Sequence, residues 1–207
     1  FMKLKILANN VLNFGINRII EIAGVAILIA GVFLIASLIS FSPNDPNFIF
    51  PDGTEIQNIF GFYGSFTSDI FFQSFGIIAL LIPFSLIVSG LNIIFNKKII
   101  LIIESIFFTI LYSLFGSLFF SLFYPMAFTL YINGNGGFIG NYLETTFLSS
   151  IININSQIFY YILLMLISFL FLISIQFKIN SFLNFIKKIL KTLLSKKEKN
   201  YTNENEI

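Results

Sequence analysis

Asn96-Lys97-Lys98 is a short basic turn that joins two long hydrophobic runs, residues 75–95 and 99–123. It holds the only Lys or Arg residues between Arg18 and Lys178. Two helices long enough to cross a bilayer, joined by so short a basic link, predict a transmembrane hairpin whose tip faces the cytoplasm. The same turn divides the chain into two similar halves.

The composition indicates a membrane protein. Hydrophobic residues make up 57% of the 207 residues and charged residues only 11%, whereas a soluble domain carries about 25% charge. The chain has no Cys and no His. Disulfides, thiol chemistry, His-ligated metals and His-based acid–base catalysis are therefore excluded within it.

Hydropathy and length predict an all-α integral membrane protein with four transmembrane helices and no β-sheet. The predicted spans cover about 19–41, 75–95, 99–123 and 158–177, with outer loops at 42–74 and 124–157. A cytoplasmic segment, 1–18, precedes this membrane domain of residues 19–177, and residues 178–207 follow it. In the outer loops, residues 65–72 and 138–152 predict short amphipathic helices at the membrane interface.

The basic residues predict the orientation. Of the twelve Lys and Arg residues, three precede the first span, two lie in the middle turn and seven follow the fourth span. Neither long loop contains any. Because Lys and Arg are enriched on the cytoplasmic side, we expect both termini in the cytoplasm and both long loops outside.

Three residues in the spans predict structural features. Glu21 follows Arg18 by three residues, which predicts an ion pair on one helix. Glu104 is close enough to the basic turn to extend its carboxylate toward the cytoplasmic surface, and its role is left open. Pro83 lies in the middle of the second span and predicts a kink there.

The N-terminal part of the chain has two interpretations. Residues 3–18 carry an apolar stripe made of Leu4, Leu7, Val11 and Phe14. This stripe suits a short helix on the membrane surface or a lead-in to the first span, and both interpretations stay open. Within that span, Gly24 and Gly31 share one face and predict a close approach to another helix.

A ridge of hydroxyl side chains is predicted along the third span. Its members recur every four residues: Ser105, Thr109, Ser113, Ser117 and Ser121. Residues four apart are neighbours on a helix, so the ridge predicts a close helix–helix seam, within the bundle or between subunits. The alternative is that each hydroxyl bonds only to its own backbone.

The C-terminal segment predicts a basic amphipathic helix. Lys187, Lys188 and Lys191 lie between apolar residues that recur at helical spacing over residues 182–194. This pattern favours a helix along the anionic cytoplasmic leaflet. A solvated continuation of the fourth span is the other interpretation.

The two halves repeat a glycine motif. Gly61-Phe62-Tyr63-Gly64 matches Gly137-Phe138-Ile139-Gly140 at an offset of 76 residues. Each motif precedes an amphipathic segment and a span, and each loop begins with a proline, Pro43 or Pro125. Both halves run from inside to outside to inside, so the repeats are parallel.

Ser42-Pro43-Asn44-Asp45-Pro46, at the end of the first span, resembles the signature of the four-helix N-terminal membrane domain of FtsK-type bacterial DNA translocases. The two glycine motifs are similar to that family's as well, and the resemblance covers about residues 35–177. The chain differs from the family pattern at Asn47-Phe48, where an aromatic such as Trp is expected. It also differs at Phe60-Gly61, where a glycine pair is usual.

The resemblance implies a multipass anchor in the bacterial cytoplasmic (inner) membrane at the division septum. It also implies a homo-oligomer, septal membrane proteins as partners, and a separate hexameric, ATP-driven motor that moves DNA during chromosome segregation. DNA would then be a partner only through that motor, which this chain lacks.

The residues of this chain predict an anchor and not an enzyme. It has no Gly-X-X-X-X-Gly-Lys-Ser/Thr stretch, which a phosphate-binding loop needs, and the glycine-rich run at 133–137 is interpreted as a turn. No catalytic, cofactor-binding or metal site is expected. The alternative is a small multipass transporter or channel subunit, but charged groups near mid-membrane, typical of transporters, are missing from the predicted spans.

Overall fold

The computed structural model describes residues 2–46, 55–125, 133–146, 152, 155–178, 184 and 187–192, with side chains from residue 9 onward. Its helices are α1 (Met2–Ile39), α2 (Gly61–Phe75), the 3₁₀ helix η1 (Gly76–Leu81), α3 (Ile82–Asn96), α4 (Ile100–Phe123), α5 (Gly137–Glu144) and α7 (Ser156–Ser174). The described part of the chain contains no strand. Four stretches are long and apolar enough to cross a membrane: Asn9–Ile39, Gly61–Asn96, Ile100–Phe123 and Ser156–Ser174. The predicted all-α membrane fold is confirmed.

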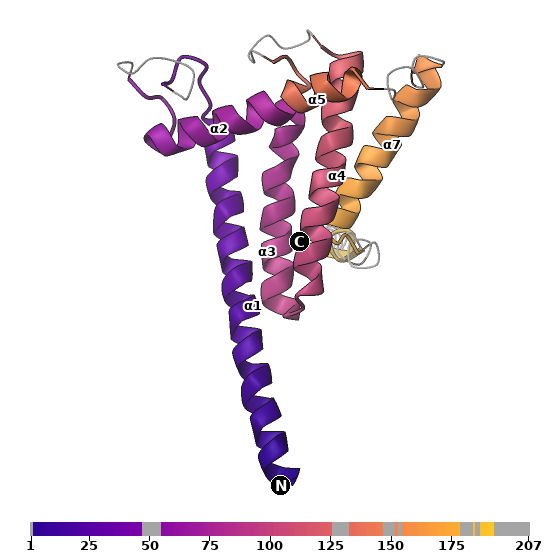
Figure 1. The fold of residues 1–207 in the computed structure, drawn as a ribbon. Coiled ribbons are helices and arrows are strands. Elements are labelled where there is room, and N and C mark those ends of the chain that lie inside the picture. The colour runs from indigo at the N-terminus through magenta and orange to yellow at the C-terminus, as the bar shows by residue number, and fades with distance from the viewer. Residues whose placement is uncertain are drawn as a thin grey trace, which may run out of the picture. The chain divides into compact units, whose positions relative to one another are not determined.

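The chain forms two compact units, Phe1–Gln176 and Phe177–Ile207. The first unit contains all the helices named above. Within it, α1 packs beside α3, and α4 packs beside α7 (Figure 1). Helix α2 lies across the ends of α1 and α3 (Figure 1). Each half of the sequence therefore builds a pair of helices packed side by side, with a further helix, α2 or α5, between them in the chain.

Helix α1 runs without a break from Met2 to Ile39. Residues 3–18 thus continue the same helix as the first predicted span, as the lead-in interpretation expects. No proline interrupts this stretch, so nothing forces the helix to end near residue 18. At ~1.5 Å per residue its 38 residues extend about 57 Å, which exceeds the ~30 Å hydrocarbon core.

The chain changes direction at the start of the second predicted span and not at Pro83, where a kink is expected. The chain turns at Gly76, whose φ of 69° suits only glycine well, and continues through η1 before α3 begins at Ile82. Pro83 lies in the first turn of α3, where its missing N–H costs no helical hydrogen bond. The predicted mid-helix kink at Pro83 is wrong, because the change of direction occurs at Gly76.

Glycines bring α1 and α3 into backbone contact. A Cβ atom on Gly24 would lie 3.1 Å from the carbonyl oxygen of Gly90, and one on Gly31 would lie 2.9 Å from the Ile87 nitrogen. A Cβ on Gly90 itself would lie 2.7 Å from the Leu28 nitrogen. The predicted close packing at Gly24 and Gly31 is confirmed.

An ion-pair cluster joins the middle of α1 to the C-terminal end of α3. Arg18 Nη1 lies 2.5 Å from Glu21 Oε2, which confirms the predicted pair. Lys97 Nζ lies 2.6 Å from Glu21 Oε1. Lys97 ends α3 with a left-handed backbone, φ 53°. The glutamate therefore ties the basic turn to the first span.

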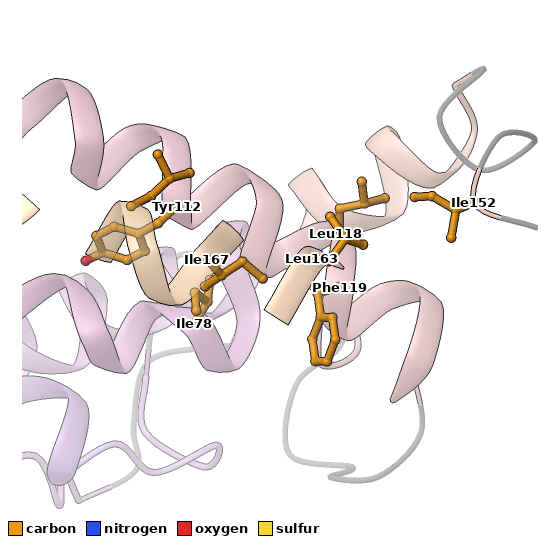
Figure 2. Close-up of a cluster of buried hydrophobic side chains, with 8 residues drawn as sticks. Ile78, Tyr112, Leu118, Phe119, Ile152, Leu163 and Ile167 are labelled. Carbon is orange, nitrogen blue, oxygen red and sulfur yellow. The ribbon is translucent and has the colours of Figure 1, made fainter. Parts of the chain in front are cut away.

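Two apolar cores fill the first unit. The larger one consists of Ile78, Tyr112, Leu118, Phe119, Ile152, Leu163, Ile167 and Leu170. In Figure 2, Tyr112 and Ile152 lie at opposite sides of this core. The smaller one consists of Leu34, Leu38, Phe72, Ala79 and Ile82. Phe75 packs against both cores, so the end of α2 connects the two halves.

Candidate functional site

Asp45 is the centre of a polar clasp just beyond the end of α1. Its side chain is almost fully buried, with 1% exposure. Oδ1 accepts a hydrogen bond from the Gln57 backbone N–H and Oδ2 accepts one from the Asn58 N–H, both at 2.9 Å. A buried carboxylate requires such donors, and here they join the two ends of the segment between α1 and α2.

Asn58 extends this clasp to the end of α1. Its side-chain amide donates to the carbonyl oxygens of Ser37 at 2.9 Å and Ser40 at 3.2 Å. Its Oδ1 accepts from the Phe60 N–H at 3.1 Å. Asn58 thereby satisfies carbonyl groups that a helix end leaves without intrahelical partners.

The other signature residues surround Asp45. The Ser42 carbonyl accepts the Asp45 N–H at 3.2 Å, and the Pro46 carbonyl accepts the Ser65 hydroxyl of α2 at 3.1 Å. Pro43 and Asn44 are exposed on the turn, whereas Pro46 is buried. The Ser-Pro-Asn-Asp-Pro string therefore forms a turn that fastens α1 to α2.

The paired glycine motifs have matching geometry. Gly61 and Gly137, at φ 60° and 64°, are the first residues of α2 and α5, a conformation that favours glycine. A Cβ on Gly64 would lie 1.9 Å from Asn58 Oδ1, and one on Gly140 would lie 2.3 Å from the Ser117 carbonyl oxygen. In both halves, the first glycine permits the turn and the second leaves room for a neighbouring group.

Asn135 is the counterpart of Asn58 in the second half. Its side-chain amide donates to the carbonyl oxygen of Tyr124, at the end of α4. The backbone carbonyl oxygen of Asn135 accepts a hydrogen bond from the Ile77 N–H of η1 at 2.9 Å. Asn135 therefore also connects the second half to the first. The sequence reasoning missed both asparagines, although each lies two or three residues before a glycine motif.

All five residues of the hydroxyl ridge are buried in the first unit. Ser105 bonds to the Ser89 hydroxyl of α3, Ser117 donates to the Phe75 carbonyl at 2.9 Å, and Ser121 donates to Asn141 Oδ1 of α5 at 3.1 Å. Successive parts of the ridge thus contact α3, the end of α2 and α5.

The remaining two members of the ridge do not bond across helices. Ser113 donates to the carbonyl oxygen of Thr109 on its own helix at 2.7 Å. Thr109 Oγ1 is buried and has no hydrogen-bond partner within the described chain. The ridge therefore combines cross-helix contacts with the backbone bonding that the alternative interpretation expects.

Residues 17–189 of the chain match the family described as the 4TM region of DNA translocase FtsK/SpoIIIE. The chain belongs to this family. The DNA translocase FtsK of Rickettsia bellii (strain RML369-C) is 33% identical over 72 residues, which are 35% of this chain and 10% of that protein. No solved structure matches the chain.

The clasp gives the Ser-Pro-Asn-Asp-Pro string a structural role in this FtsK/SpoIIIE region, because Asp45 accepts hydrogen bonds from two backbone N–H groups of the following segment. Of the two departures from the family pattern, Asn47-Phe48 lies outside the described residues. At the other, the ring of Phe60 packs 4.8 Å from that of Phe33, measured between centroids. Phe60 thus makes an aromatic contact with α1.

The remaining predicted residues lie near the start of α4 or in the second unit. Glu104 is exposed on α4 and forms no salt bridge with any residue that the structure describes. Lys187, Lys188 and Lys191 are exposed on a helical segment, 187–192. Most of the apolar stripe predicted beside these lysines falls outside the described residues, so their contact with the membrane surface stays a prediction.

Proposed function

We propose that this chain is the membrane-anchoring and assembly domain of an FtsK-like DNA translocase that acts in cell division and chromosome segregation. The observation that carries the proposal is the family match over residues 17–189, which includes most or all of each of the four candidate spans. The clasp residues support an anchoring role, because their polar groups build the fold.

The proposed location is the bacterial cytoplasmic membrane, with both termini in the cytoplasm. The distribution of Lys and Arg supports this orientation. The ion-pair cluster of Arg18, Glu21 and Lys97 fits a position at a membrane interface, because charged side chains there avoid burial in hydrocarbon.

The chain lacks a motor domain, and in this proposal the ATP-driven step belongs to a separate part of the full-length protein. DNA is then contacted by that motor and not by the membrane domain. The proposed partners of the domain are further copies of this chain, septal membrane proteins and the bilayer. Lys187, Lys188 and Lys191 would lie against the anionic inner leaflet.

Localisation tests the proposal. A fluorescent protein fused to the C-terminus of this chain is expected to be enriched several-fold at septa over the lateral membrane in dividing cells. The control is an unrelated four-helix membrane protein with the same fusion. It corrects for the extra fluorescence that any membrane protein gives where two layers of membrane meet at the septum. A uniform distribution, equal to that of the control, would contradict the proposal and leave the transporter or channel alternative in place.

A further inference from the structure

The inner end of α7 is held by hydrogen bonds from α3. The hydroxyls of Ser85 and Ser174 are 2.8 Å apart, and Ser89 donates to the Ser174 carbonyl oxygen at 3.3 Å. All three serines are essentially inaccessible, with exposures of 0–1%. Polar groups in a membrane need partners inside the protein, and here the partners belong to different helices.

Two side-chain amides add further bonds at the same end. Asn92 of α3 donates to the Ile175 carbonyl oxygen at 3.3 Å. Gln176 donates to the Leu101 carbonyl oxygen of α4 at 3.1 Å. We call these four cross-helix bonds the exit joint, formed by Ser174, Ile175 and Gln176 with Ser85, Ser89, Asn92 and Leu101.

The backbone of Gln176 is unusual. Its φ of 52° is left-handed, which is uncommon for residues other than glycine and costs energy. Its N–H donates to the Ile173 carbonyl at 2.8 Å, and its side chain bonds to α4. The first compact unit ends at this residue and the second begins at Phe177, so the chain leaves the bundle at the exit joint.

Apart from the exit joint, α7 packs against α4 through apolar side chains, among them Leu163, Ile167 and Leu170 of the larger core. Only 17% of its most hydrophobic window is buried, compared with 44% for α4. Two of its hydroxyls away from the joint bond as follows: Tyr160 to Tyr124 at the other end of the helix and Ser168 to its own backbone. A pull on α7 from the inner side would therefore meet the exit joint first.

We propose that the exit joint transmits force: it passes tension on the chain beyond Gln176 to α3 and α4, so that α7 is not extracted alone. The biological need for such a joint rests on the proposed function, because a motor that moves DNA exerts an equal and opposite pull on its anchor. The mechanical property itself does not depend on that function.

The chain has no Cys, so single-molecule handles can be placed at will. Lys98→Cys and Lys178→Cys, both at exposed positions, would load the joint directly in the full chain reconstituted in lipid. The measurement is the lifetime of the folded state at constant force. Losing one interhelical hydrogen bond in a membrane is expected to shorten this lifetime about threefold. Asn92→Leu/Gln176→Leu removes two such bonds and is therefore expected to shorten it about tenfold.

Two matched controls distinguish a loss of force transmission at the exit joint from a general loss of stability. Asn96 donates its amide to the Asn92 carbonyl of its own helix at 2.8 Å, so Asn96→Leu is expected to leave the lifetime unchanged. Ser174→Ala is a milder joint variant, expected to shorten the lifetime about threefold, and Ser168→Ala is its control on α7.

Unchanged lifetimes in both joint variants, or equal shortening in the controls, would overturn the proposal. Should Asn92→Leu/Gln176→Leu fail to fold, the comparison of Ser174→Ala with Ser168→Ala decides alone. A negative result here leaves the septal localisation test untouched, and a uniform localisation leaves these lifetimes untouched. The two proposals can therefore fail separately.

Discussion

Replacing Asp45 is expected to open the polar clasp and destabilise the domain. The carboxylate is 1% exposed and accepts two backbone N–H groups at 2.9 Å. Hydrogen bonds to charged groups contribute roughly 1.5–3 kcal/mol each, so Asp45→Ala is expected to cost about 3–6 kcal/mol. Asp45→Asn keeps one carbonyl oxygen as acceptor and is expected to lose about half of that.

Reversible unfolding in mixed detergent–SDS micelles measures the free energy of unfolding for each variant. Glu55→Ala is the matched control, because it removes an exposed carboxylate from the same loop and is expected to change stability by less than about 0.5 kcal/mol. If Asp45→Ala and Glu55→Ala have the same effect, the clasp does not hold the loop and the reasoning fails.

Two further predictions use the same unfolding assay. Gly76→Ala is expected to cost well over ~1 kcal/mol, because its Cβ would lie 1.8 Å from the Asn135 carbonyl oxygen at a positive φ. Gly15→Ala, which has open space around it, is expected to stabilise α1 by up to about 1 kcal/mol, and equal effects would contradict this account. Ser117→Ala is expected to lose only ~0.6 kcal/mol with its bond to Phe75, whereas Ser117→Leu overfills a site with no exposure and is expected to cost about 1–3 kcal/mol. Similar changes in the free energy of unfolding for the two Ser117 variants would contradict the close helix–helix seam.

The spans and the repeat could be predicted because their signals are local. A hydrophobic run of about 20 residues has few alternatives to a membrane helix, and the glycine motif is visible in each half. The hydroxyl ridge could also be found from its four-residue spacing. The sequence does not show which helices the ridge contacts, because Ser105, Ser117 and Ser121 bond to three different elements.

Contacts between residues far apart in the sequence could not be predicted from the sequence alone. Lys97 lies 76 positions after Glu21, and no local pattern pairs them. Asn58 and Asn135 resemble ordinary loop asparagines until the preceding helix end is placed beside them. A proline inside a hydrophobic run predicts a kink, because proline is the usual cause of kinks. Here the chain turns at Gly76, and Pro83 lies in the first turn of the next helix.

The account requires a cytoplasmic exit for the chain, because only there can a motor reach DNA and ATP. Cysteine labelling tests this most directly, since the chain has no Cys of its own. Tyr63, 76% exposed on α2, and Asn96, exposed at the end of α3, are suitable positions on the two proposed sides. In intact spheroplasts, Tyr63→Cys is expected to react with a membrane-impermeant thiol reagent and Asn96→Cys to react only after lysis. Labelling of Asn96→Cys but not of Tyr63→Cys before lysis would contradict the account.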